Sequence, residues 1–348
     1  MKRLYFRPLI IILAILFLFS GTLVYSYPRL TAVAYQPTQR YSKAECVIEL
    51  NSRRVLYEEN GDVRLPMAST TKIVTCITVL EICNDIKSTF PIPQEAVGVE
   101  GSSVYLQAQE IYSVEDLLYG LMLRSGNDCA TALALFCSGS IANFAAEMNK
   151  IAQKAGALHS NFENPHGLPH KNHYTTARDL SYITAYAMQN PTFRKIVGAQ
   201  NYPSRGWKNK NKLLFSYESC IGVKTGYTKE AGRCLVAAAK QENMCVISCV
   251  LNCPSMYERS KKLLQDSLSS YQYEKIIDAS VPLNIEGSTI RGIADKDYYY
   301  PLLKEEKGLI EIRTYAHENM RIENREIVGK FEIYLAKRLL FSGNLYKL

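Results

Sequence analysis

The order of its hydrophobic patterns constrains the fold of this 348-residue chain more than any other feature. Short apolar runs come first, apolar residues at helical spacing fill the middle, and short apolar runs return afterwards. Because strands that flank a block of helices in this way usually join one antiparallel sheet, the pattern predicts an α+β fold. The expected strands are 46–50, 54–58, 222–228, 234–240 and 244–251. One expected helix begins at Ser69, and the others cover 113–125, 130–136, 141–156, 176–189 and 255–277.

The C-terminal part of the chain has a different pattern. Residues 279–348 contain short alternating segments separated by turn residues, and the alternation in 330–341 suits strands with one face in water. A chain of this length also favours two domains. We therefore expect an α+β domain over residues 44–278 and a small all-β domain over residues 279–348.

The N-terminus has the pattern of an export signal. Residues 1–26 begin with the basic Lys2, Arg3 and Arg7, and an uncharged apolar run follows. A cleaved secretory signal is the favoured interpretation, with cleavage after Ser26, and an uncleaved membrane anchor is the alternative. Residues 27–43, which are polar and contain two prolines, are the expected linker.

Composition excludes several classes of protein. With 47% hydrophobic and 21% charged residues, the chain is neither disordered nor collagen-like. The formal charge of +8 falls to about +5 without the three basic residues of the signal. We therefore expect no nucleic-acid partner.

The ten cysteines and five histidines do not predict a metal site. No CxxC pair occurs, and most cysteines lie inside apolar stretches, where cysteine behaves as a small buried hydrophobe. Four of the histidines cluster in residues 159–173 without acidic partners at helical spacing. An exported chain with an even number of cysteines can form disulfides, so the disulfide pattern stays open.

The first chemical motif is Ser69-Thr70-Thr71-Lys72 at the start of an expected helix. The i, i+3 spacing puts the Ser69 hydroxyl and the Lys72 amine on one helix face. A serine hydroxyl needs an adjacent base to become a nucleophile, and a neutral lysine can be that base when burial lowers its pKa. On this motif alone, a capping serine with an exposed lysine is the commoner explanation.

Two further motifs follow in the chain. Ser125 and Asn127, two residues apart after an apolar helix, can both face one cleft, where the hydroxyl passes a proton and the amide holds the lysine or a peptide. Lys224-Thr225-Gly226 lies in an expected strand, where the amine and hydroxyl suit a carboxylate and the glycine admits substrate backbone. The N–H of the next residue, Tyr227, can join that of Ser69 as an oxyanion hole.

The ordered set of three motifs is far more specific than any one of them. SxxK, SxN and KTG in this order are the signature of penicillin-binding proteins and class A β-lactamases. Over residues 44–273 the chain resembles the serine-type D-alanyl-D-alanine carboxypeptidases, the low-molecular-mass penicillin-binding proteins. The resemblance rests on longer blocks such as RLPMASTTKIVT, YSVEDLLYGLMLRSGNDCATALA, MNKIAQKAGALHSNFENPHGL and GVKTGYTKEAGRCLVAAA.

This resemblance implies a fold and a set of catalytic roles. The fold would be a β-lactamase/transpeptidase-like catalytic domain, with a helical subdomain, followed by the small β domain. Ser69 would be the nucleophile that forms an acyl-enzyme, and Lys72 would accept its proton. Ser125 would relay a proton to the leaving D-alanine, and Asn127 would hold Lys72 and the substrate amide.

The resemblance also implies binding partners and a location. Lys224 and Thr225 would bind the terminal carboxylate of a peptidoglycan pentapeptide stem or of a β-lactam antibiotic, and no cofactor or metal would be needed. The protein would work outside the cytoplasm, at the cell membrane or wall. Family members often end in an amphipathic anchoring helix, whereas this chain ends in the strand-like LYKL, which favours attachment, if any, through the N-terminus.

Two other functions remain as alternatives. A β-lactamase needs a carboxylate-activated water for deacylation, and Glu163 is present between the second and third motifs, although without the ExxLN arrangement of class A enzymes. A non-catalytic peptidoglycan-binding scaffold of the same fold would not need to retain Ser69, Lys72, Ser125 and Lys224 together.

Overall fold

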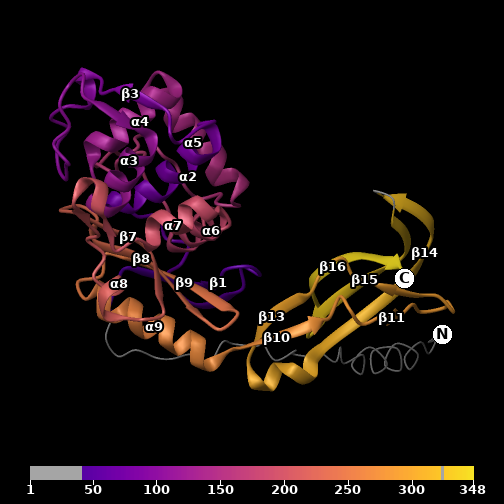
Figure 1. Cartoon of the computed structure of the whole chain (residues 1–348). Helices are drawn as coiled ribbons and strands as arrows, with labels where there is room; N and C mark the ends of the chain where they lie inside the picture. Colours follow the sequence, from indigo (N-terminus) through magenta and orange to yellow (C-terminus); the bar gives the residue numbers. More distant parts are fainter. Residues whose placement is uncertain (1–40, 323–324) are drawn as a thin grey trace, which may run out of the picture. The chain divides into compact units, whose positions relative to one another are not determined.

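The computed structural model describes residues 41–322 and 325–348, so the expected signal and most of the expected linker lie outside the described residues. A five-stranded sheet forms the centre of the larger part, with every neighbouring pair antiparallel (Figure 1). Its order is β2-β1-β9-β8-β7, which confirms the predicted antiparallel sheet. The strands are β1 (Ala44–Glu49), β2 (Val55–Glu59), β7 (Cys220–Thr228), β8 (Gly232–Gln241) and β9 (Met244–Leu251).

Both faces of this sheet are covered by helices, and the alternation along β9 shows how. Ile247 and Cys249 pack into the cluster beneath the helices of the middle region, while Val246 and Val250 pack into the cluster beneath α9. Because every residue of β9 is buried, its cysteines are core residues, as their apolar surroundings predict. The helices are α2 (Lys72–Ile82), α3 (Val114–Tyr119), α4 (Asn127–Ser138), α5 (Ile141–Lys154), α6 (Ala177–Ala187), α7 (Pro191–Gly198), α8 (Leu213–Ser216) and α9 (Met256–Ser270).

Several helix starts follow from local sequence. At α3, for example, the Ser113 hydroxyl accepts a hydrogen bond from the Asp116 N–H, as a serine at the N-cap position does. Two short antiparallel strand pairs accompany these helices: β3 (Thr89–Pro91) with β4 (Ile111–Ser113), and the hairpin of β5 (Asn201–Tyr202) with β6 (Trp207–Lys208). Within the described ranges no single helix is long and apolar enough to cross a membrane, and only α4 and α5, bent by 89° at their junction, pass that test as a pair.

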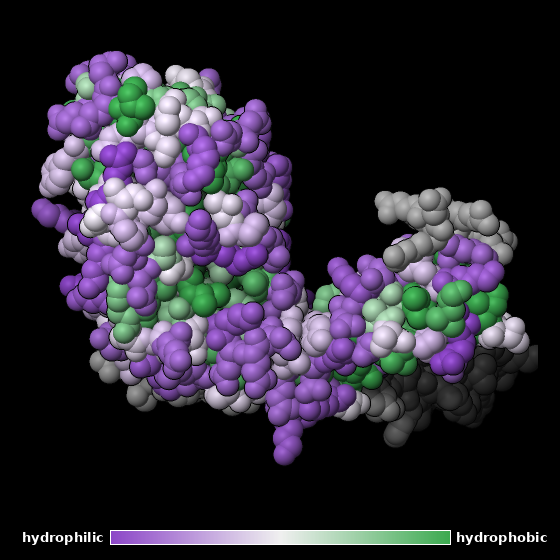
Figure 2. Space-filling view, viewed as in Figure 1, coloured by the Kyte–Doolittle hydropathy of each residue, from purple (hydrophilic) through white to green (hydrophobic). Residues whose placement is uncertain are grey.

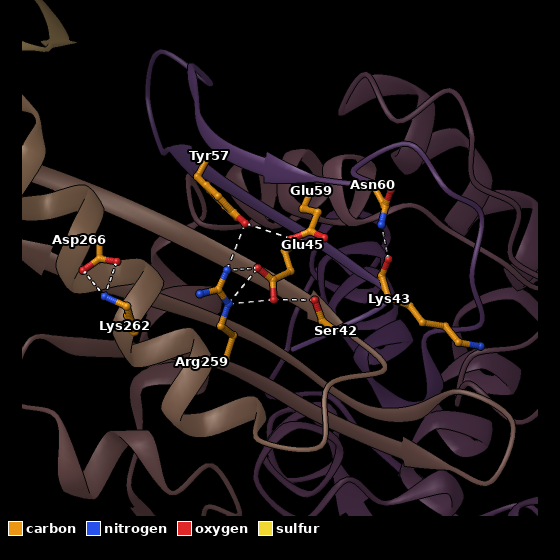
Figure 3. Close-up of polar contacts among 9 residues, drawn as sticks. All are labelled: Ser42, Lys43, Glu45, Tyr57, Glu59, Asn60, Arg259, Lys262 and Asp266. Carbon is orange, nitrogen blue, oxygen red and sulfur yellow. Dashed lines mark hydrogen bonds and ion pairs between the residues drawn. The ribbon is translucent and has the colours of Figure 1, made fainter. Parts of the chain in front are cut away.

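A buried ion pair fastens α9 to the sheet (Figure 3). The Arg259 guanidinium of α9 donates to both carboxylate oxygens of Glu45 on β1, with N–O distances of 2.5 to 2.9 Å, and it also donates to the Tyr57 hydroxyl. Ser42 donates a further hydrogen bond to Glu45. Because the two charged side chains are almost fully buried, removing either one would leave the other without compensation.

The helix predicted over 255–277 is wrong in its last third. α9 ends at Ser270, and residues 272–277 instead form β10 (Gln272–Ile277), which pairs antiparallel with β13 (Tyr298–Leu302). The segment carries Tyr273, Ile276 and Ile277, residue types that suit a strand once a partner strand is available. That partner lies about 25 residues further along the chain, too far for a local helical pattern to reveal.

The C-terminal region is built of strands, as predicted. Its larger sheet has the order β11-β12-β16-β15-β14 around a core that includes Phe331, Ile333 and Leu345. The β15–β16 turn is made by Ala336 and Lys337, both with positive φ, as a two-residue hairpin turn requires. The strands are β11 (Leu283–Asn284), β12 (Arg291–Ile293), β14 (Ile310–Ile322), β15 (Arg325–Leu335) and β16 (Arg338–Lys347).

The surface is more hydrophilic than this interior, as expected for a folded protein. Figure 2 shows hydrophilic residues over most of the visible face, with hydrophobic residues in separate groups among them. Apolar residues contribute a large share of the surface of any folded protein.

Candidate active site

The serine and lysine of the first motif meet as the spacing predicts. Ser69 lies in a short 3-10 turn, Ala68–Thr71, that leads directly into α2 at Lys72. The Lys72 amine lies 3.0 Å from the Ser69 hydroxyl oxygen. Lys72 is fully buried rather than an exposed lysine behind a capping serine, and the N-cap position of the turn is Met67 and not Ser69.

Two acceptors hold the other side of the Lys72 amine. Nζ donates to the side-chain oxygen of Asn127 at 2.6 Å and to the backbone carbonyl of His166 at 2.7 Å. The Asn127 amide is oriented by its own nitrogen, which donates to the carbonyl of Glu100 at 2.5 Å. Its oxygen must therefore face Lys72, so the first and second motifs are joined at this atom.

The surroundings of Lys72 favour its neutral form. Burial lowers the pKa of Lys72 well below its usual range, and the nearby positive charge of Lys224 lowers that pKa further. A lysine with a lowered pKa in a pocket beside a serine hydroxyl has the properties of a general base.

Ser125 follows an unusual piece of backbone. α3 runs into a π-helical turn, Gly120–Arg124, and Ser125 after it has φ +66°, in the left-handed region. The side chain is 5% exposed, and its hydroxyl has no hydrogen-bond partner among the described residues. Non-glycine residues in this conformation concentrate at functional sites.

Asp128 ties the second motif to the segment 100–106, which the sequence did not mark as part of the site. Its carboxylate accepts hydrogen bonds from the Ser103 hydroxyl and from the backbone N–H groups of Val104 and Leu106. The N–H of Asn127 donates to the Ser102 carbonyl at 2.7 Å. The loop and the second motif therefore form one connected unit.

The third motif lies on the outer strand of the sheet, β7, beside the turn that carries Ser69. A side-chain carbon at Gly226 would lie only 3.0 Å from the backbone nitrogen of Ser69, so glycine permits the close approach. The buried Lys224 amine donates to the Thr225 carbonyl at 2.9 Å, and burial, with a smaller contribution from Lys210, lowers the pKa of Lys224 to about 7. Thr225 is half-buried, and the Tyr227 side chain is 65% exposed.

One contributor was missed from the sequence, the loop Asn164–Leu168. Its His166 carbonyl is a partner of Lys72, and the Thr75 hydroxyl donates to the Pro165 carbonyl at 2.6 Å. Gly167 has φ +88°, and a side-chain carbon there would lie 2.0 Å from the Ala68 carbonyl oxygen. A backbone carbonyl leaves no mark in a sequence, so the glycine is the only signal that could have indicated the contact.

Neither metal ligands nor disulfides are present in the part of the chain that the structure describes. No group of three or more His, Cys, Asp or Glu side chains there could hold a metal ion, and all ten cysteines are free thiols. The contacts of Lys72 and Lys224 described above are made with hydroxyl, amide and backbone groups.

Comparison with known proteins identifies the family. A family model described as D-alanyl-D-alanine carboxypeptidase matches residues 31–255. The chain belongs to this family. The carboxypeptidase is 33% identical over 350 residues to D-alanyl-D-alanine carboxypeptidase DacF of Bacillus subtilis, with 96% of this chain and 86% of that protein covered. It is a serine-type hydrolase of the D-Ala-D-Ala class, and its family acts on the peptides of peptidoglycan, outside the cytoplasm.

Solved structures agree with this assignment. Penicillin-binding protein 5 from Haemophilus influenzae matches 90% of the carboxypeptidase and 98% of its own chain, with a TM-score of 0.75 and 28% identity. A DD-transpeptidase of Streptomyces K15 matches 65% of this chain and 96% of its own, with a TM-score of 0.61 and 32% identity. These likenesses confirm the predicted β-lactamase/transpeptidase-like fold.

Proposed function

We propose that the carboxypeptidase releases terminal D-alanine through an acyl-enzyme on Ser69, with Lys72 as the general base. The single observation that carries this assignment is the three-way contact of the Lys72 amine with Ser69, Asn127 and the His166 carbonyl. A neutral amine has two N–H groups and one lone pair. Because two of its three neighbours can only accept, both N–H groups go to them, and the lone pair is left for the Ser69 hydroxyl proton.

The reaction then follows in two steps. Ser69 Oγ attacks the carbonyl carbon of the penultimate D-alanine while its proton passes to Lys72, and the tetrahedral oxyanion faces the N–H groups of Ser69 and Tyr227. The Ser69 N–H belongs to the first turn of a helix, where such groups lack intrahelical partners. Ser125 gives its proton to the leaving amine and takes up the proton held by Lys72 as the peptide bond breaks. Water then hydrolyses the ester, gives a proton back to Ser69 Oγ and releases the shortened peptide.

Substrate binding is assigned to the edge of β7. The charged form of Lys224 and the hydroxyl of Thr225 bind the terminal carboxylate of a pentapeptide stem, or the equivalent carboxylate of a β-lactam. Gly226 keeps the strand close to Ser69, so that the scissile carbonyl lies against the nucleophile. Asn127 holds two groups, the Lys72 amine and the amide of the substrate.

The β-lactamase alternative is less well supported. Glu163, the carboxylate that could activate a deacylating water, is exposed and accepts a hydrogen bond from the Asn161 side chain. No contact joins it to Ser69 or Lys72 within the described ranges. The scaffold alternative is weakened because Ser69, Lys72 and Asn127 are connected by direct hydrogen bonds.

Labelling with a fluorescent penicillin tests the proposal. The parent protein should form a covalent adduct, Ser69→Ala should form none, and the matched control Ser269→Ala, a remote exposed serine of α9, should label like the parent. Release of D-alanine from a stem-peptide mimic separates the carboxypeptidase from the scaffold, and rapid turnover of penicillin would instead favour the β-lactamase. An unlabelled parent would refute the acyl-enzyme.

We also propose that the N-terminus directs the protein to the outer face of the cell membrane or to the wall. The support is the basic, then apolar sequence of residues 1–26. The mass of the mature protein distinguishes cleavage after Ser26 from retention of an anchor, since an anchored protein keeps all 348 residues and sediments with membranes.

A further inference from the structure

The chain has one tryptophan, Trp207, and it lies on the backbone that leads to Ser125. A side-chain carbon added at Gly120, the first residue of the π-helical turn, would lie 2.7 Å from Cys129 Sγ and 3.1 Å from Cη2 and Cζ3 of the indole. The outer edge of the indole therefore rests on the Gly120 backbone. Trp207 belongs to β6, outside the three catalytic motifs, and it plays no part in the mechanism proposed above.

The π-helical turn connects this contact to the catalytic serine. The Gly126 N–H reaches back to the Gly120 carbonyl at 3.2 Å, which closes a wide loop of backbone that contains Ser125. π-Helical turns are uncommon and occur frequently at functional sites. Because Gly120 is the base of this loop, contacts that fix the position of Gly120 also restrain the backbone that carries Ser125.

The hairpin that carries Trp207 is itself fastened to both ends of the segment. At α3, the Asp116 carboxylate accepts hydrogen bonds from the Tyr202 hydroxyl at 2.8 Å and from Arg205 at 2.7 Å. Tyr202 also stacks on Tyr119, with ring centroids 4.0 Å apart. These contacts fix the position of the β5–β6 hairpin relative to α3, the helix that precedes the π-helical turn.

At the other end, two hydrogen bonds join the hairpin to the residues just before Ser125. The Lys210 N–H donates to the Leu123 carbonyl at 3.1 Å, and the Arg124 guanidinium donates to the Lys208 carbonyl at 3.1 Å. Leu123 and Arg124 are thus held by hydrogen bonds to residues 208 and 210, at the end of the hairpin and just after it.

We infer that Trp207 is a positioning residue for the reaction, which holds the π-helical turn so that the Ser125 hydroxyl faces the leaving group. This inference rests on the proposed role of Ser125. The Ser125 hydroxyl has no hydrogen-bond partner of its own among the described residues, so the backbone beneath it must supply its orientation. Ser125 takes part in proton transfer and not in carboxylate binding, so loosening it should slow the chemical step and leave binding intact.

Three variants test the inference with a stem-peptide mimic. Trp207→Ala should lower kcat by roughly 10- to 100-fold, the range expected for a misplaced catalytic group, with KM changed by no more than about twofold. Trp207→Phe keeps an aromatic ring on Gly120 and should restore most of the loss. Tyr273→Ala removes a partly buried aromatic from a stack with Tyr299, outside the site, and should leave kcat unchanged.

A double-mutant cycle separates positioning from general loosening of the fold. If Trp207 acts through Ser125, the Trp207→Ala change should have little further effect on the acylation rate in a Ser125→Ala background. Additive losses, or Trp207→Ala with the parent kcat, would overturn the inference while leaving the penicillin adduct of the parent, and so the proposed function, intact. A parent without that adduct would instead remove the proposed function itself.

Discussion

At the scale of single residues, the two buried lysines should set the pH dependence of the reaction. Lys72 must be neutral to act as a base, so kcat/KM should rise as pH rises through its lowered pKa. Lys224 must be charged to bind a carboxylate, so kcat/KM should fall as pH rises through the pKa of Lys224, about 7 in the free enzyme. A bound carboxylate stabilises the charged amine, so the alkaline limb of kcat should lie at higher pH than that of kcat/KM.

Rate profiles for the parent and Lys224→Arg measure this expectation. Arginine stays charged across the accessible range, so its variant should lose the alkaline limb near neutral pH even if its overall rate is lower. An unchanged alkaline limb in Lys224→Arg would assign that limb to another group.

A second residue-scale prediction concerns stability and His173. Nδ1 of His173 accepts the Glu163 N–H, so the ring must carry its proton on Nε2 and donate to Thr71 Oγ1 at 2.9 Å. Burial first, and then His170 and Lys72, lower the pKa of His173 from 6.5 to about 4. Between pH 6.5 and pH 4, His173 is therefore protonated in the unfolded chain but stays neutral in the folded protein. The free energy of unfolding should fall as pH decreases through this range.

This loss is roughly 2 kcal/mol at pH 5 for His173 alone. Thermal unfolding of the parent and of His173→Gln at pH 7 and pH 5 measures it. The variant should lose less of its Tm on acidification than the parent does, whereas His159→Gln, a change at an exposed histidine, should behave like the parent. Equal acid sensitivity in all three proteins would show that His173 is not the titrating group.

At the scale of elements, the loop Asn164–Leu168 should depend on Gly167. An alanine there combines a strained φ of +88° with a clash against the Ala68 backbone, and Gly139 offers a matched control with φ +70° and open space around it. Gly139→Ala should cost only the strain, about 1 kcal/mol. Gly167→Ala should in addition displace the Ala68–Ser69 turn or the His166 carbonyl, and so slow acylation by penicillin at least about tenfold.

Acylation rates and unfolding curves of the two variants separate these effects. If Gly167→Ala were acylated at the rate of Gly139→Ala, the contact between this loop and α2 would have no part in orienting Ser69 and Lys72.

The same scale shows what the sequence could predict. Ser69, Lys72, Asn127 and Lys224 were expected to share one site from the order of their motifs and from the family resemblance, and the structure joins Ser69, Lys72 and Asn127 by direct hydrogen bonds. Two contacts could not be predicted from the sequence: the hydrogen bond from Lys72 to the His166 carbonyl, and the hydrogen bonds from the 100–106 loop to the Asp128 carboxylate. Both depend on the packing of segments that are distant in the chain. β10 was missed for a similar reason, since its strand character comes from β13.

At the scale of the whole molecule, we propose that residues 44–278 and 279–348 act as a catalytic and a β domain, except that β10, at the end of the first range, pairs with β13 of the second. One contact joins the Arg54 side chain, beside β2, to the C-terminal residues. Its guanidinium donates two hydrogen bonds to Glu306, at 2.9 and 2.6 Å, and one to the Pro301 carbonyl at 2.6 Å. The rings of Tyr271 and Tyr300 lie about 5 Å from it, so the pair is enclosed.

Because Glu306 is buried, Arg54→Ala should strand a carboxylate and lower the free energy of unfolding by roughly 3 kcal/mol or more. The matched control is Arg313→Ala, which removes an exposed arginine paired with Glu311 and should cost less than about 1 kcal/mol. Adding Glu306→Gln to Arg54→Ala should recover part of the loss, since the unpaired charge is then gone.

The acylation rate of Ser69 at 25 °C should stay at the parent value in all of these variants, because the contact shares no residue with the site. Denaturant unfolding and penicillin labelling measure both quantities, and an Arg54→Ala cost no larger than that of Arg313→Ala would mean that this contact does not hold the two regions together.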